Sequence, residues 1–149
     1  LVFSVDRRNG YQLALTRHGI VPKPEYCVEL PSITAGEDTP VHALLRSASR
    51  PTAIVVSDDI LALTLERICT ETGLSIPADL SILSFNNSLF ARLTSPQLTS
   101  IDINSCQLGM EAAAQMISHI ENPGLPATKI LVPHQLIERD SCARPASHE

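Results

Sequence analysis

The chain has 149 residues, a length typical of about one domain, and its hydrophobic residues (44%) far outnumber its charged residues (18%), which excludes an intrinsically disordered chain. The formal net charge is −5, and the 11 Lys and Arg residues are scattered among 16 Asp and Glu residues without a basic run. DNA binding requires clustered cations, so this stretch is not expected to bind DNA by itself. No apolar run approaches the ~18 residues that a membrane span requires, so we expect no membrane partner.

The cysteines and histidines lack the spacing of a metal site or a redox pair. The four cysteines include no C-x-x-C pair, and the five histidines show no H-x-x-x-H spacing. We therefore expect no metal, no cofactor, and a reduced, cytoplasmic protein. The first residue is Leu1 rather than Met, so we expect the chain to be part of a longer protein.

The first elements expected along the chain are mostly helical. The pattern at 10–18 predicts a helix that ends at Gly19, where a left-handed residue is favoured. Residues 26–30 are compatible with a short strand. A further helix is expected to begin at Thr39-Pro40, because threonine caps free amides and proline fits the first turn, and to run to about Ser47.

From residue 53 onwards, strands and helices alternate regularly. The apolar run 53–56 is typical of a fully buried parallel strand. Asp58 or Asp59 is expected to start a helix that ends at Gly73. The later elements expected in chain order are strands at 80–84 and 98–103, a helix at 104–120 opened by an Asn104–Gln107 capping box, and strands at 129–132 and 135–137.

Strands separated by helices of this length predict an α/β fold with a parallel sheet. In such sheets, ligands bind outside the carboxyl ends of the strands. Two polar stretches follow strands and therefore mark a candidate site: 57–59 (Ser-Asp-Asp) and 84–87 (Ser-Phe-Asn-Asn).

These motifs together resemble the effector-binding core of the lactose-repressor/galactose-repressor (LacI/GalR) family. Each motif is weakly specific alone, but their order and spacing are specific together. The matching stretches are 7–11 (RRNGY), 51–63 (PTAIVVSDDILAL), 73–88 (GLSIPADLSILSFNNS), 95–109 (SPQLTSIDINSCQLG) and 136–141 (LIERDS). Within the family, the 84–88 stretch (SFNNS) is similar to repressors of maltose operons, which suggests maltose or a related α-glucoside.

The resemblance implies a periplasmic-binding-protein-like (type I) domain with two α/β subdomains and a sugar effector in the cleft between them. It also implies a homodimer and an upstream headpiece that binds operator DNA. On this analogy, residues 1–102 form the C-terminal subdomain, 103–128 cross to the N-terminal subdomain, 129–141 return, and 142–149 form a loose tail. The 104–120 helix would then expose its apolar face in this chain by itself.

The resemblance assigns effector binding to Arg7, Asp58 and Asn86. A guanidinium fork, a carboxylate and an amide can all bond to adjacent sugar hydroxyls. Asn86 departs from the family, which commonly has an aspartate there, and this puts affinity and sugar preference in question. The alternatives are an exposed arginine at a helix start, helix capping by Asp58, and a turn-forming asparagine. Asp59 could supply the cap equally well and is the less favoured of the two aspartates for ligand contact.

A dimer surface is expected near Leu63, Phe90 and Leu93, with ordinary core packing as the alternative. Phe85 is expected in the core rather than beside the cleft, and Arg8 is expected to face solvent. Two other functions stay open: a periplasmic sugar-binding protein of a transporter, and a small α/β enzyme. We expect no enzyme and no catalytic residue, because no G-x-S-x-G, P-loop or G-x-G-x-x-G motif is present and adjacent carboxylates cannot flank a glycosidic bond.

Overall fold

The computed structural model describes residues 2–29 and 40–145. Before the sheet begins, the chain forms α1 (Val2–Arg17), a 3-10 helix (Pro24–Tyr26) and α2 (Pro40–Arg46). The alternating part that follows consists of β1 (Ala53–Val55), α3 (Asp59–Thr72), β2 (Ser81–Phe85), α4 (Leu89–Leu93), β3 (Thr99–Asp102), α5 (Ser105–Glu121) and β4 (Gln135–Ile137).

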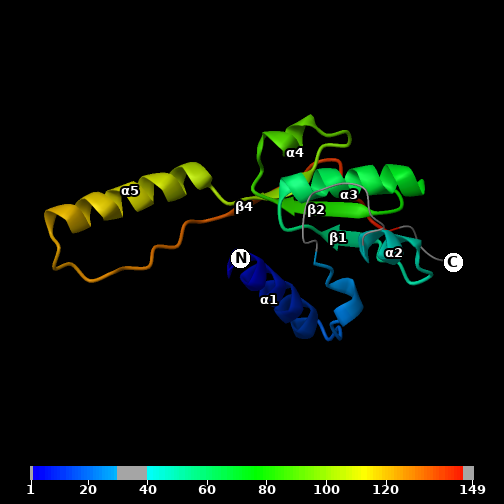
Figure 1. Ribbon diagram of the computed structural model, residues 1–149, viewed down its shortest axis with the longest axis horizontal. Coiled ribbons are helices and arrows are strands. Elements are labelled where there is room, and N and C mark those ends of the chain that lie inside the picture. Colours follow the sequence, from blue (N-terminus) through cyan, green and yellow to red (C-terminus); the bar gives the residue numbers. More distant parts are fainter. Residues whose placement is uncertain (1, 30–39, 146–149) are drawn as a thin grey trace.

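The strands form one sheet in the order β1-β2-β3-β4. β1 pairs with β2 and β2 with β3 in parallel, whereas β4 runs antiparallel to β3. The α/β class and the parallel sheet are therefore confirmed, with an antiparallel strand added at one edge. Figure 1 shows α3 along one side of the strands and α1 away from it on the other side.

The hydrophobic core lies between the sheet and the helices α2, α3 and α4. Its α3 residues recur at helical spacing, so one side of the helix faces the sheet. Local signals fix both ends of α3: the Asp58 carboxylate accepts from the Leu61 N–H, and Gly73 ends the helix at φ 74°. The core consists of Val41, Leu45, Val56, Ala62, Leu65, Ile68, Cys69, Leu80, Ile82, Ala91 and Leu98.

α5 extends away from the sheet as an arm, and the chain returns beside it to reach β4 (Figure 1). None of its residues is buried. The expected apolar face is exposed, with Leu108 at 48%, Met116 at 67% and Ile120 at 71% of their accessible surface. In the described ranges, no helix is long and apolar enough to cross a membrane.

Several expected elements differ from the structure. The first helix begins at Val2 instead of residue 10. The strand expected at 26–30 is wrong over its described part, because Pro24 favours a 3-10 turn closed by the Cys27 N–H on the Pro24 carbonyl. Leu30, like the expected cap Thr39, lies outside the described residues.

Two predictions about strands are wrong because the expected neighbouring strands are not beside these segments in the described chain. The run 53–56 does form a parallel strand, but β1 lies at the sheet edge and Val55 is 50% exposed, so full burial was wrong. Residues 129–132 form no strand, because no strand of the described chain lies beside them to accept their hydrogen bonds.

Two details at chain junctions also differ. Asn104 precedes α5 as expected and has a φ of 53°. Its side-chain amide donates to the Gln107 side chain at 2.9 Å instead of capping a backbone N–H, so the predicted capping box is wrong. Cys142 and Ala143, expected in a loose tail, are hydrogen-bonded to Ile82 and Ser81 of β2.

Candidate effector site

Arg7 of α1 contacts groups at the carboxyl ends of two neighbouring strands. Its Nη1 donates to the Ser57 carbonyl, which follows β1, and its Nη2 donates to Asn86 Oδ1, which follows β2, at 3.4 Å. The guanidinium also lies over the Phe85 ring, 4.2 Å from its centroid, as a cation–π contact. Arg7 therefore joins α1 to the sheet edge at which ligands of parallel sheets bind.

The electrostatics of this edge combine a cation with a carboxylate. Partial burial lowers the pKa of Arg7, and the nearby Asp58 carboxylate offsets only part of this decrease. Guanidinium groups titrate so far above neutral pH that Arg7 stays charged. The edge therefore presents a fork of donors next to a group that accepts hydrogen bonds.

Asp58 is half-buried and caps α3. Its Oδ1 accepts from the Leu61 N–H at 2.8 Å, and its extended backbone (φ −161°) is typical of a helix cap. The capping alternative is thus confirmed for one carboxylate oxygen. The second oxygen takes no part in the cap, so capping leaves it available to accept from another group.

Asn86 lies at the end of β2 with a positive φ of 95°. Asparagine is enriched among the non-glycine residues that adopt positive φ. The Asn86 N–H donates to the Ile101 carbonyl at 2.8 Å, which fixes the turn, while Oδ1 accepts from Arg7. The structure thus brings Arg7, Asp58 and Asn86 together at one edge of the sheet, although they are far apart in sequence.

Asp59, next to Asp58, has a different environment and is only 1% exposed. Its Oδ1 accepts from the hydroxyls of Ser84 at 2.5 Å and Ser100 at 3.0 Å, and its Oδ2 accepts from the Ser88 N–H at 2.6 Å. Asp59 therefore links α3 to β2 and β3 and is not placed to contact a ligand.

Sequence reasoning missed this serine–aspartate cluster, although a signal was present. Ser84 and Ser100 are hydroxyl residues within neighbouring strands, and they pair with each other in the β2–β3 register. Buried hydroxyls require partners, so a buried acceptor nearby was predictable. Phe85 was also placed wrongly, because it is half-buried beneath Arg7 and flanks the site.

The other named residues lie on the surface or near it. Arg8 is exposed, as expected, and pairs with Glu29 at 3.2 Å. Phe90 is 43% and Leu93 69% exposed, so the core alternative is wrong for both, whereas Leu63 is partly buried. Among residues 2–29 and 40–145, no group of His, Cys, Asp and Glu side chains could hold a metal ion.

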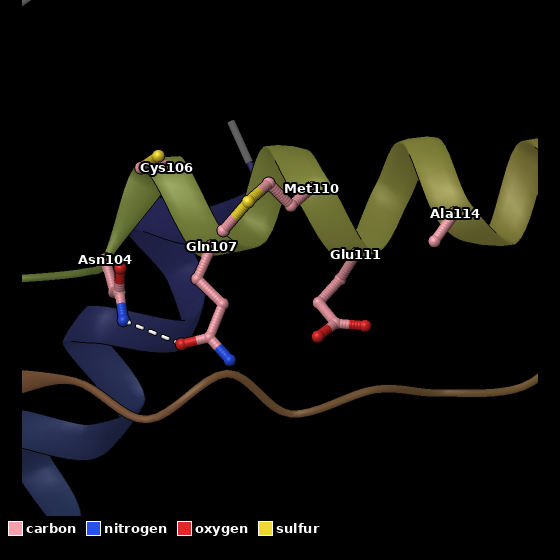
Figure 2. A pocket seen from close by; sticks show the side chains of 6 residues that line it. All are labelled: Asn104, Cys106, Gln107, Met110, Glu111 and Ala114. Atoms are coloured by element: carbon pink, nitrogen blue, oxygen red, sulfur yellow. Dashed lines mark hydrogen bonds between the residues drawn. The ribbon is translucent and has the colours of Figure 1, made fainter.

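A separate hollow lies along α5 and does not include the Arg7 site. In Figure 2, Gln107 and Glu111 point from α5 toward the returning chain, and the dashed line joins Asn104 to Gln107. Because α5 has no buried residue, this hollow is a surface feature of the arm. It is lined by Asn104, Cys106, Gln107, Met110, Glu111 and Ala114.

Comparison with known proteins identifies the family. The periplasmic binding protein-like domain family matches residues 2–142. The ribose operon repressor of Haemophilus influenzae is 33% identical over 118 residues, which are 79% of this chain and 36% of that protein. The chain belongs to the LacI/GalR family of effector-binding domains. Catabolite control protein A of Priestia megaterium is 30% identical over 132 residues, 89% of this chain and 40% of that protein.

Solved structures of LacI regulators share the fold of this LacI/GalR chain. A transcriptional regulator LacI from Bacillus cereus subsp. cytotoxis NVH 391-98 superposes with a TM-score of 0.86 at 35% identity, covering 94% of this chain and 50% of that one. A sugar-binding LacI-family regulator from Escherichia coli, complexed with phosphate, gives 0.79 at 26% identity and covers 95% and 51%. The predicted family and its α/β fold are confirmed.

The LacI/GalR chain spans 36% to 42% of the length of the curated relatives it matches. Several of these relatives are named as transcriptional repressors, and repression is a non-enzymatic function.

Proposed function

We propose that Arg7, Asp58 and Asn86 bind a sugar effector, and that this chain is the sensing part of a LacI/GalR-type repressor. The contact that carries the proposal is the bridge from Arg7 to the Ser57 carbonyl and Asn86, over the Phe85 ring. The guanidinium supplies donors, Asp58 an acceptor, and Asn86 both. Vicinal hydroxyls of a sugar, each a donor and an acceptor, complement this set.

The exposed arm supports the proposed domain organisation. α5 exposes several large apolar side chains along its length, and exposed apolar side chains on one element favour an interaction site there. We propose that residues 1–102 belong to the C-terminal subdomain, that 103–128 cross to an N-terminal subdomain which covers α5, and that 129–141 return. The effector would then lie between this sheet edge and the second subdomain.

The mechanism is a shift between two arrangements of the subdomains. A sugar that binds one arrangement more tightly raises its population, and the change moves an upstream DNA-binding headpiece in a homodimer. Because binding free energies are linked, operator DNA and sugar alter each other's affinity by the same factor. The site lies at the ends of β1 and β2, and α5 leaves the same sheet from the end of β3, so the elements needed for coupling are adjacent.

The sugar itself is proposed on narrower grounds. The 84–88 sequence (SFNNS) resembles maltose-operon repressors and favours maltose or a related α-glucoside. Similar proteins point elsewhere: one is named a ribose operon repressor, and a LacI-family regulator from Enterococcus faecium has bound ribose. Maltose and ribose are therefore the two sugars to compare.

The experiment is a thermal-shift and calorimetric titration of both sugars on this chain and on the longer protein that we propose. A ligand that binds only the folded state stabilises it by about 2.7 kcal/mol at 100 times its Kd. We expect a saturable rise in Tm with maltose. A rise with ribose alone would replace maltose as the effector. No rise with either sugar, on this chain or on the longer protein, would contradict the proposed effectors.

A further inference from the structure

Asn87 connects the effector edge with the end of β3, which leads to α5, and with Arg139, which lies beyond β4. It follows Asn86 directly, and both residues have positive φ, 95° for Asn86 and 46° for Asn87. The side chains of these two residues contact different neighbours. Asn86 contacts Arg7, whereas Asn87 contacts groups beside β3 and β4.

On the outgoing side, Asn87 holds the end of β3. Its Nδ2 donates to Asp102 Oδ2 at 2.9 Å. The other oxygen, Asp102 Oδ1, accepts from the N–H of Asn104 at 2.7 Å, directly before α5. Both hydrogen bonds lower the pKa of Asp102 and keep its carboxylate ionised, and the bond from Asn87 has the larger effect.

On the returning side, Asn87 holds Arg139, which follows β4. Arg139 Nη2 donates to Asn87 Oδ1, and Nη1 donates to the Leu98 carbonyl at 2.6 Å. The Arg139 N–H also donates to Thr99 Oγ1 at 3.0 Å. One amide thus bonds to the last residue of β3, which leads into the arm, and to Arg139, which lies beyond β4, the strand that receives the returning chain.

We propose that Asn87 is a positioning residue that sets the direction of α5 relative to Arg7 and Asn86. Its relevance to sensing rests on the proposed function of those two residues, but the contacts themselves do not. The amide of Asn87 suits both partners, because its Nδ2 donates to the Asp102 carboxylate while its Oδ1 accepts from the Arg139 guanidinium. An aspartate at position 87 would accept from Arg139 but would face Asp102 as a like charge.

A residue swap tests this arrangement. In Asn87→Asp, the hydrogen bond to Asp102 is lost. In the double variant Asn87→Asp with Asp102→Asn, the new amide at position 102 donates to the new carboxylate at 87, and its carbonyl still accepts from Asn104. The double variant also has the same net charge as the parent. Asn122→Asp, at the far end of α5, carries the same charge change as the single variant and serves as its control.

The readout is the set of amide residual dipolar couplings of α3 and α5, which report the relative orientation of the two helices. We expect both helices to fit one alignment in the parent chain, the α5 couplings to collapse in Asn87→Asp while those of α3 persist, and the double variant to restore them. Asn122→Asp should match the parent.

Other outcomes overturn the proposal. These are unchanged α5 couplings in Asn87→Asp, an equal loss in α3 and α5, or a double variant no better than the single one. If the single variant does not fold, restored folding and couplings in the double variant support the proposal, and an unfolded double variant refutes it. No sugar is present, so a failure of sugar binding would reject the proposed function without altering this result.

Discussion

Asp58 and Asp59 are adjacent in sequence, yet their carboxylates lie in opposite environments. Asp58 is half-buried at the sheet edge, where it caps α3 and lies near Arg7. Asp59 is buried and accepts from Ser84, Ser88 and Ser100. Asp58 precedes α3 with an extended backbone, whereas Asp59 is the first helical residue, so the two side chains point to different neighbours.

The same substitution at the two positions should therefore give opposite results. Asp58→Asn should leave the free energy of unfolding nearly unchanged, because asparagine caps as well as aspartate, and should weaken sugar binding. Asp59→Asn should cost about 2–3 kcal/mol, because an amide brings its own donors to a site filled by three donors. Urea denaturation and calorimetry measure the two effects, and equal destabilisation of both variants would contradict the assignment.

Glu66 predicts a pH dependence of stability. Burial raises the pKa of Glu66 to about 7, and its Oε1 is buried without a hydrogen-bond partner in the described chain. Since this pKa lies above the ordinary value of 4.5, the folded protein holds a proton that the unfolded chain releases. The contribution of Glu66 to stability is therefore present at low pH and is lost as pH rises through about 7.

Removing this titration should flatten the pH profile. In Glu66→Gln, the fall in Tm between about pH 5 and pH 8 should shrink, and Tm at the alkaline end should rise. Glu121→Gln, exposed at the end of α5, is the matched control and should retain the parent profile. A Glu66→Gln profile that parallels the parent would show that Glu66 does not titrate in this range.

The arm should tolerate polar residues in this chain. Met116→Lys and Ile120→Lys should change the free energy of unfolding by no more than about 0.5 kcal/mol, because both side chains are exposed. Ile68→Ala, at a position only 1% exposed, should cost about 2–5 kcal/mol. Chemical denaturation compares the three. In the longer protein, the arm variants should become destabilising, and their continued neutrality there would argue against a covering subdomain.

The exposed apolar side chains of α4 should carry the proposed dimer. Phe90→Glu and Leu93→Glu should shift this chain toward monomer in sedimentation velocity, because a charge buried in an apolar contact is costly. Met116→Lys, on α5, should leave association unchanged. A chain that is monomeric at every concentration, or a dimer indifferent to both α4 changes, would reject this surface.

Much of the fold was predictable because its signals are local. The helix start at Asp58 and its end at Gly73 depend on hydrogen bonds and backbone angles within a few residues. The edge position of β1, the antiparallel β4 and the missing strand at 129–132 depend on which segments lie beside each other. Apolar runs do not encode that information, so these features could not be derived from the pattern.

The site was predictable in part. The two strand ends followed from the rule for parallel sheets, but Arg7 required the family resemblance, because nothing local shows that α1 reaches the sheet edge. The division of roles between Asp58 and Asp59 depends on which of them is the cap and which is the first helical residue, and the sequence allowed either choice. The Asp102–Asn87–Arg139 contacts join segments far apart in sequence and were not anticipated.

Calorimetric titration of Arg7→Lys and Arg8→Lys with the sugar that binds the parent chain tests the central claim most directly. A lysine lacks the planar fork with which Arg7 spans the Ser57 carbonyl and Asn86, so Arg7→Lys should weaken sugar binding at least about 10-fold, equivalent to about 1.4 kcal/mol. Arg8 is exposed and paired with Glu29, so the Arg8→Lys variant should bind the sugar with the affinity of the parent. Parent-like affinity in Arg7→Lys, or an equal loss in both variants, would contradict a sugar site built around Arg7.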